Sequence, residues 1–360
     1  MPQNPEAWLL TVARNRQRDI VRSASHRLTV PIDDVVIGSV ADVLDNLDPD
    51  AIPDRRLALL FVCAHPVIDP AVRTPLMLQT VLGFDAEQIA RAFVIPTATL
   101  AQRLVLAKRR IRDAGIPFQV PDRSQMPARL APVLEAIYGA YAIDWSLVSG
   151  VETRESLAAE SHWLAVTLAQ LLPDEPEVLG LAALISFSLA RRTARGSAAD
   201  YVPLDEQDTS LWDADLIALG ERDLRRAEEA RTIGCFQIEA ATQSVHCARS
   251  TSGVTDWTAL RTLYVALLSF APTLGAHVAH AATIGRIDGP RAGLAALDAI
   301  SGDAVHRFQP AWAVRAQLLH EEGLLDESLA AYDKAISLTV QGGERAYLER
   351  KRSLAAQHRN

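Results

Sequence analysis

Apolar residues recur at helical spacing in the stretch 85–93, which opens with a helix-start signal. Asp85 suits an N-cap position, and Gln88 three residues later completes a capping-box pattern. The apolar stripe that follows consists of Ile89, Ala90 and Phe93. The stretch therefore predicts a short helix with one buried face.

A second stretch, 96–113, begins with Pro96, whose fixed φ suits the first turn of a helix. Its apolar face carries Leu100, Leu104, Ala107 and Ile111. Its other face carries Arg103, Lys108, Arg109, Arg110 and Arg112. Two helices, a tight turn and a basic second helix are what a DNA-binding helix-turn-helix requires. An ordinary helical hairpin with a solvated charged face fits the same spacing.

Residues 55–83 precede this pair and predict two further helices. Pro66 ends the first helix, Asp69 and Pro70 begin the second, and Gly83 closes it. Together with the pair above, this block has the composition of a small helical domain.

From residue 126 onward, Ala- and Leu-rich segments of helix length alternate with short polar breaks. The clearest segments are 157–172, 176–192, 210–230, 258–270 and 308–338. Small and aromatic residues occupy the positions typical of a tetratricopeptide repeat at Gly323, Ser328, Tyr332 and Ala335. A similar pattern occurs about one repeat earlier, at Gly293, Leu297 and Ile300. The pattern predicts a stack of paired helices whose concave face binds proteins or peptides. An irregular helical bundle is the alternative.

Composition indicates a globular chain with ample core. The chain has 360 residues, 49% of them hydrophobic, and three cysteines without a close pair, which favours a reducing compartment over a disulfide scaffold. The N-terminus has no signal-peptide pattern, and no apolar run approaches the roughly 18 residues that a membrane span needs. We therefore expect a cytoplasmic protein without membrane contact.

Charge alternates in blocks along the chain, although the net charge is −8. Residues 1–27 carry +3, residues 28–54 carry −7, residues 55–113 carry +5 and the remainder carries −9. A nucleic-acid footprint is local, so the positive blocks matter more than the net sign. The opposite charges of residues 55–113 and of the remainder also predict an attraction between these two parts of the chain. Through this contact the acidic C-terminal part would control the basic domain.

The sequence contains few motifs that indicate catalysis or the binding of a metal or cofactor. The sequence has no phosphate-binding loop, no dinucleotide-binding glycine pattern, no HExxH and no CxxC. Cys63 and His65 lack the second pair that a zinc site would need, and His277 and His280 share a helix face where packing is the simpler role. An acidic cluster falls on a polar loop and not in an apolar pocket: Asp205, Glu206 and Asp208. We therefore expect no enzyme activity, no cofactor and no metal.

Several strings resemble a known family. TLAQRL at 99–104, followed by AKRR at 107–110, resembles the recognition helix of region 4 in RNA polymerase sigma factors of the extracytoplasmic-function group. WLLTVARNR at 8–16 resembles the end of sigma region 2. EQIARAF at 87–93, LLPDEPEVLGLAAL at 171–184 and PLDEQD at 203–208 are similar to a bacterial subgroup with a tetratricopeptide-like C-terminal extension.

The resemblance implies an all-α protein in four parts: a remnant of sigma region 2 at 1–27, an acidic linker at 28–54, a region 4 helix-turn-helix domain at 55–120 and a tetratricopeptide-like regulatory domain at 121–360. It implies promoter DNA and core RNA polymerase as partners, with recognition of the −35 element by the helix-turn-helix. A further partner is expected on the C-terminal domain, either within the chain or another protein.

The resemblance also implies which residues meet DNA. Bases would be read by Thr97, Thr99, Gln102 and Arg103, phosphates held by Lys108, Arg109 and Arg110, and the opened promoter faced by Arg14, Asn15 and Arg18. The family's earlier region 2 helices have no counterpart before Trp8, so the chain is a fragment, its start codon is placed late, or it is a degenerate paralogue. The alternative is therefore a truncated paralogue that does not initiate transcription and acts as a helical-repeat interaction module with residual DNA binding.

Overall fold

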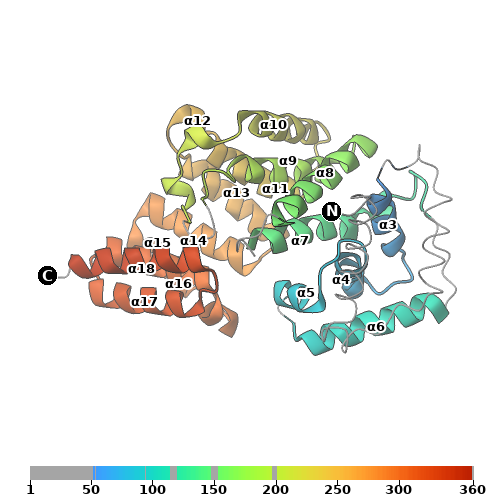
Figure 1. Ribbon diagram of the computed structural model, residues 1–360. Coiled ribbons are helices and arrows are strands. Elements are labelled where there is room, and N and C mark those ends of the chain that lie inside the picture. Colours follow the sequence, from blue (N-terminus) through green and yellow to red (C-terminus); the bar gives the residue numbers. More distant parts are fainter. Residues whose placement is uncertain are drawn as a thin grey trace, which may run out of the picture. The chain divides into compact units, whose positions relative to one another are not determined.

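The computed structural model describes residues 52, 54–93, 95–113, 120–146, 153–196 and 201–358. Within these ranges every regular element is a helix, which confirms the predicted all-α class (Figure 1). The chain divides into two compact units, Met1–Ala136 and Ile137–Asn360. The expected region 2 remnant, with Arg14, Asn15 and Arg18, and all but two residues of the expected linker at 28–54 lie outside the described residues.

The first unit contains the two predicted helix pairs and the start of a longer helix. Its helices are α3 (Arg55–Cys63), α4 (Pro70–Thr80), α5 (Ala86–Ala92), α6 (Thr97–Asp113), η2 (Pro127–Arg129) and the first half of α7 (Leu130–Ser146). The predicted start and stop signals act as expected around α4. The Asp69 carboxylate accepts a hydrogen bond from the backbone N–H of Ala71 at 3.0 Å, and Gly83 follows the helix with φ +78°.

The core of the first unit is built from all four of the helices α3 to α6. Helix α4 packs against α3, α5 and α6. The least exposed large side chains of this core include Leu57, Leu60, Phe61, Met77, Leu78, Ile89, Leu100 and Leu104. Two residues of η2 and α7 contact this part of the unit: Arg129 Nη1 donates to the Phe61 carbonyl at 3.4 Å, and Thr74 Oγ1 donates to Glu135 Oε2 at 2.8 Å.

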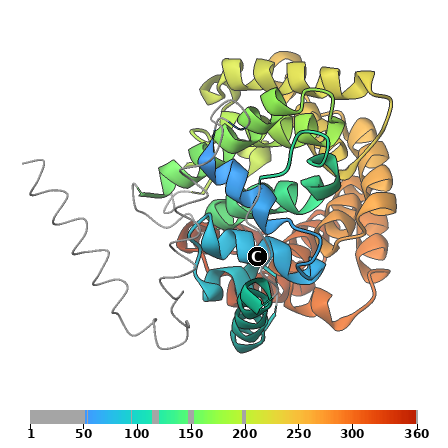
Figure 2. The same ribbon diagram turned by 90° about the vertical axis from the view of Figure 1, so that its right-hand side faces the viewer.

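The second unit begins around one buried helix. Helix α9 (Pro176–Ala190) is apolar or small at nearly every position, so it is buried almost all round. Helices α8 (Thr153–Leu171), α10 (Ala214–Glu229) and α11 (Cys235–Cys247) pack against it (Figures 1 and 2). The loop between α9 and α10 contains two short turns, η3 (Leu204–Glu206) and η4 (Thr209–Leu211), and a one-turn helix, α12 (Arg249–Ser252), follows α11.

The rest of the second unit is a succession of helices in which each packs on the next. They are α13 (Trp257–Phe270), α14 (Leu274–Asp288), α15 (Pro290–Asp298), η5 (Asp303–Arg307), α16 (Gln309–Glu321), α17 (Leu325–Leu338) and α18 (Gly342–Gln357). The predicted segment 308–338 is two helices, because Gly323, with φ +83°, turns the chain between α16 and α17.

Apolar side chains in this succession gather in consecutive clusters. One cluster consists of Val278, Ala281, Leu297, Ala311 and Leu318. The next consists of Ala316, Leu319, Ala331, Tyr332, Ala335, Leu348 and Ala355. Separate clusters between neighbouring helices are what stacking of helix pairs produces.

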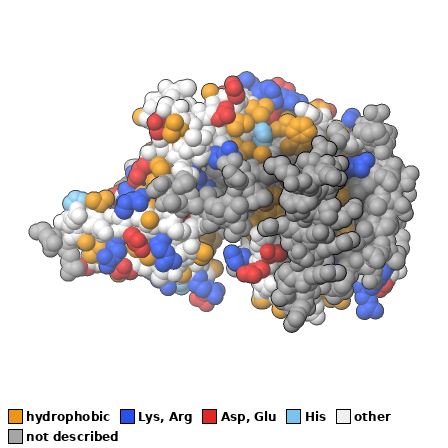
Figure 3. Space-filling view, viewed as in Figure 1, with side chains coloured by type: hydrophobic (Ala, Val, Ile, Leu, Met, Phe, Trp, Pro, Cys, Tyr) orange, Lys and Arg blue, Asp and Glu red, His pale blue; other side chains and the backbone are white. Residues whose placement is uncertain are grey.

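The surface of these last helices mixes both signs of charge (Figure 3). Ion pairs join successive helices: Arg291 with Glu322, Arg315 with Asp298, and Arg352 with Asp333. Across the described part of the chain, no single helix is both long and apolar enough to span a membrane. The pair α5 and α6 reaches the required length and apolarity only when its two helices are taken together across a sharp bend.

Candidate nucleic-acid interface

Helices α5 and α6 are joined by the short turn 93–96, and the chain bends by 113° between them. The predicted capping box starts α5: Gln88 N–H donates to Asp85 Oδ1 at 2.8 Å, and Asp85 N–H donates to Gln88 Oε1 at 3.0 Å. In the turn, Ile95 N–H donates to the Ala90 carbonyl at 3.0 Å. Local hydrogen bonds therefore set the angle at which α6 leaves α5.

The apolar face of α6 anchors it to the first unit. Leu100 and Leu104 are 1% and 2% exposed, and Ala107 and Ile111 are half-buried. Helix α6 packs through this face on α4 and α5. Burial of the predicted apolar residues leaves the opposite face of α6 in solvent.

That opposite face carries the arginines. Arg103, Arg109, Arg110 and Arg112 are all exposed. Arg109 pairs with Asp113 at 3.4 Å, and Arg112 lies 3.8 Å from the same carboxylate. Among the described residues no carboxylate lies within 4.0 Å of Arg103 or Arg110. These two guanidinium groups are the cations on α6 that remain open to an anion from outside.

Lys108 departs from the expectation that it shares the solvent face with the arginines. Its Nζ donates to Gln79 Oε1 on α4 at 2.8 Å. Burial lowers the pKa of the ammonium, while the nearby Cys63 thiol acts in the opposite direction. The reason is helical geometry: Lys108 follows Leu104 by four residues, so it lies beside the buried stripe and braces α6 against α4.

The exposure of Phe93 also differs from the prediction. The predicted stripe is right for Ile89 and Ala90, which are 0% and 2% exposed, and wrong for Phe93, which is 40% exposed. Phe93 is the C-cap residue of α5, and its N–H still donates to the Ile89 carbonyl at 3.0 Å, so the side chain keeps its helical position and is exposed because it lies at the end of the helix.

The first turns of α6 carry the residues expected to read bases. Thr97, Gln102 and Arg103 are exposed and Thr99 is half-buried. The spacing of four between Thr99 and Arg103 puts these two side chains on one side of the helix. Polar side chains at this end are free to donate to and accept from base edges.

An exposed leucine on the same helix was missed by the sequence reasoning. Leu106 is 56% exposed, and Gln102, Leu106 and Arg110 follow one another at four-residue spacing, so they line one ridge. The signal was available, since Leu106 lies two residues after Leu104 and therefore faces away from the buried stripe. An apolar side chain between two polar ones suits contact with a thymine methyl group or a sugar.

Cys63 is the last residue of α3, and His65 follows the C-cap residue Ala64. Cys63 Sγ lies 4.0 Å from Thr80 Oγ1, and burial raises the pKa of its thiol to about 11. His65 Nδ1 accepts a hydrogen bond from the Val67 N–H at 3.2 Å. Over the ranges that the structure describes, no group of three or more His, Cys, Asp or Glu side chains is placed to hold a metal ion.

Comparison with known proteins finds a family model that matches part of the chain and a relative that matches most of it. A model described as a family of unknown function (DUF6596) matches residues 129–228, from the end of η2 to the end of α10. An uncharacterized protein of Rhizobium meliloti (strain 1021) is 33% identical over 352 residues, which cover 96% of this chain and 83% of that protein. No solved structure is significantly similar to the chain. The fold defines an all-α protein with an exposed basic helix, and the chain belongs to the same family as the Rhizobium meliloti protein.

Proposed function

We propose that this protein is a sigma-factor-like transcription initiation subunit that acts in the cytoplasm. It directs core RNA polymerase to promoters, and α6 reads the −35 element from the major groove. The observation that carries the proposal is the solvent face of α6, where Arg103 and Arg110 stand without an ion-pair partner among the described residues. Arginine is the side chain that most often reads guanine and holds phosphate.

The angle between α5 and α6 supports a helix-turn-helix. Such units join their helices at roughly 90–120° through a turn of about three or four residues. The bend of 113° and the turn 93–96 agree with both values. In this arrangement the N-terminal turns of α6 meet the bases.

The contacts along α6 support a change in the roles that the resemblance implies for its side chains. We propose that Thr97, Thr99, Gln102 and Arg103 meet base edges and that Arg110 holds a phosphate. Arg109 contributes less charge because Asp113 already pairs with it at 3.4 Å. Lys108, held by Gln79, braces the helix and does not reach a phosphate.

The second unit is proposed to regulate initiation as a tetratricopeptide-like stack. Two successive helix pairs meet at small residues, Gly285 against Gly293 and Ala316 against Ser328. The two contacts are separated by about one repeat length in the sequence. Stacks of this kind present surfaces for proteins or peptides, which suits control by a partner.

The proposal is tested with the full chain, bacterial core RNA polymerase and a randomised duplex DNA library. We expect the chain to co-purify with the core enzyme and the complex to enrich a common DNA sequence. For that sequence, Arg103→Ala should weaken binding by about 5- to 150-fold, the equivalent of about 1–3 kcal/mol. Arg225→Ala removes the same charge from an exposed position on α10 and should leave binding unchanged.

The outcomes separate the candidate functions. A chain that neither binds core polymerase nor enriches any sequence overturns the proposal. Enrichment by the chain alone, with no binding to core polymerase and no transcripts from the selected site, would instead support a non-initiating DNA-binding paralogue.

A further inference from the structure

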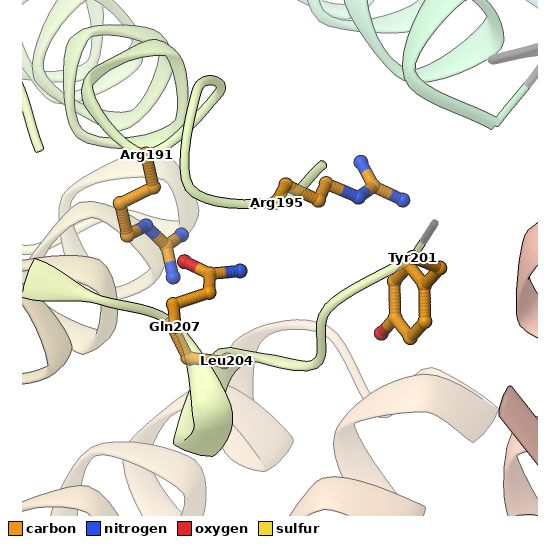
Figure 4. Close-up of a pocket in the computed structure, with 5 residues that line it drawn as sticks. All are labelled: Arg191, Arg195, Tyr201, Leu204 and Gln207. Carbon is orange, nitrogen blue, oxygen red and sulfur yellow. The ribbon is translucent and has the colours of Figure 1, made fainter. Parts of the chain in front are cut away.

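The loop between α9 and α10 contains a short acidic segment, residues 203–208, which we term the acidic loop. It carries three carboxylates and no basic side chain: Asp205, Glu206 and Asp208. Leu204 and Gln207 of this loop line a small pocket beside Arg191, at the end of α9 (Figure 4). The side chains of Asp205 and Glu206 reach instead to two of the last helices of the second unit, α14 and α18.

The backbone of the acidic loop is fixed to α12. Arg249 donates to the carbonyl oxygens of Asp205 at 3.1 Å and Gln207 at 2.9 Å. The Arg249 guanidinium also lies over the ring of the buried Trp212, 5.1 Å from its centroid. The loop is therefore held on one side by backbone contacts, while its carboxylates point to another part of the unit.

Arg286 of α14 holds the first carboxylate. Its Nη2 lies 2.7 Å from Asp205 Oδ2. Its guanidinium also lies over the Trp257 ring of α13, 5.4 Å from the ring centroid. An arginine that stacks on an aromatic ring loses little further side-chain entropy when it binds a carboxylate. Arg286 is thus oriented for an acidic side chain by contacts outside the acidic loop.

Tyr347 and Lys351 of α18 hold the second carboxylate. Lys351 Nζ lies 2.9 Å from Glu206 Oε1, and the Tyr347 hydroxyl donates to the same oxygen at 3.3 Å. The two donors are four residues apart, so they lie on one face of α18. Burial and the neighbouring Glu206 raise the pKa of Tyr347, so the hydroxyl keeps the proton that it donates. Two donors on α18 therefore converge on one carboxylate oxygen.

The contacts of the two carboxylates are open to solvent. The side chains of Asp205 and Arg286 are both 44% exposed, and that of Glu206 is 49% exposed. Exposed ion pairs contribute little to stability and weaken as salt is added. Among the described residues, the backbone of the acidic loop makes no hydrogen bond to α14 or α18. Rotation of two side chains is therefore enough to release Arg286, Tyr347 and Lys351.

We propose that Arg286, Tyr347 and Lys351 form a carboxylate-binding surface for an acidic segment of a partner protein, and that the acidic loop occupies this surface as an internal competitor. Since Asp205 and Glu206 are consecutive, the partner segment should also carry two adjacent carboxylates. Helical stacks bind peptides on such surfaces. The proposal deepens the partner-dependent regulation proposed for the second unit. It does not depend on DNA binding or on polymerase binding, so the two tests can fail independently.

The test uses the full chain and a fluorescently labelled peptide with the sequence of residues 201–208. The double variant Asp205→Asn/Glu206→Gln, the opened chain, keeps the shape of the loop and removes its two charges. Fluorescence anisotropy at low salt should show that the peptide binds the opened chain at one site. Binding should be about 10-fold tighter than to the wild-type chain, because a tethered competitor acts at a high effective concentration. Sodium chloride should weaken it.

Variants of the surface and a matched control localise the binding. In the opened chain, Arg286→Met together with Lys351→Met should weaken peptide binding about 3- to 25-fold, as expected for the loss of two partly exposed ion pairs. Arg225→Met together with Lys334→Met removes the same two charges from exposed positions on α10 and α17. This control should leave binding unchanged.

A second peptide, with Asn and Gln in place of the two adjacent acidic residues, should bind neither chain. Three results would overturn the carboxylate-binding surface: no binding of the acidic peptide to either chain, equal binding of the two peptides, or an equal loss in the control pair. Equal affinity of the wild-type and opened chains for the acidic peptide would overturn the internal competition.

Discussion

Gly285 of α14 and Gly293 of α15 bring the backbones of two neighbouring helices into contact. A Cβ added to Gly293 would lie 2.8 Å from the Gly285 Cα, 2.9 Å from Leu318 Cδ1 and 3.1 Å from the Ala281 carbonyl oxygen. Two of these three neighbours are backbone atoms of α14, which cannot move aside alone. The pair therefore sets the spacing of one helix pair in the second unit.

Gly293→Ala should destabilise the chain by about 1–3 kcal/mol, because overpacking forces α14 and α15 apart. Gly275→Ala is the matched control, since its Cβ would meet only Thr273 Oγ1, at 4.0 Å. This control should be neutral or stabilise by up to about 1 kcal/mol through helix propensity. Urea unfolding of both variants measures the difference, and equal stabilities would contradict the role of the glycine pair.

Glu177 gives a second prediction, because a residue of α9 caps a different helix. Its carboxylate accepts hydrogen bonds from the backbone N–H groups of Phe236 at 3.0 Å and Gln237 at 3.1 Å, at the N-terminus of α11. Glu177→Gln removes the charge and one acceptor and should lower the free energy of unfolding by about 1–2 kcal/mol. Asp174→Asn, a charge loss at a nearby exposed position, should change it far less.

Glu239 of α11 should make the chain less stable as pH rises from about 4.5 to about 6. Burial raises the pKa of Glu239 to about 6 from an ordinary 4.5, with Glu177 adding to the effect. The folded state then binds more protons than the unfolded state within this window, so its stability falls by roughly 1–2 kcal/mol as pH rises through it. Glu239→Gln should remove this contribution to the pH dependence of stability, and Glu228→Gln, at an exposed position, should keep the pH dependence of the wild-type chain.

His246 on the same helix should act with the opposite sign. Burial, with help from Arg191 and Arg249, lowers its pKa from 6.5 to about 4. The unfolded state binds more protons between these values, so stability is lost as pH falls through that window. In the wild-type chain, Glu239 and His246 therefore make opposite contributions to the slope of unfolding free energy against pH. Urea unfolding between pH 4.5 and 6.5 should therefore show stability rising with pH in Glu239→Gln and falling in His246→Gln. Slopes of the same sign in both variants would contradict the assignment.

The salt dependence of DNA binding should distinguish two cations of α6. Arg110→Ala should reduce the slope of log affinity against log salt by about one unit, since one phosphate contact is lost. Lys108→Ala should leave that slope unchanged and lower stability by about 1 kcal/mol through loss of its hydrogen bond to Gln79. The measurement uses the polymerase complex on an enriched DNA sequence. A reduced slope in Lys108→Ala would show that its ammonium leaves Gln79 and reaches a phosphate.

Local chemistry made much of the fold predictable. The capping box of Asp85 and Gln88, the start of α4 at Pro70 and the turn at Gly83 depend on residues a few positions apart. The apolar stripe of α6 was also visible, because Leu100 and Leu104 follow the helical period. The same period did not show that Phe93 is exposed, since burial at a helix end depends on what packs against it.

The sequence by itself determined that the chain is helical, where helices such as α4 and α5 begin, and which face of α6 carries the arginines, because those properties follow from neighbouring residues. Only the tertiary structure decided which Lys and Arg side chains already have a hydrogen-bond or ion-pair partner. Lys108 donates to Gln79 from 29 positions away, and Lys351 of α18 pairs with Glu206 of η3 at 2.9 Å. Such partners are chosen by how helices pack, and the energy of a buried charge depends on every group that the packing places around it.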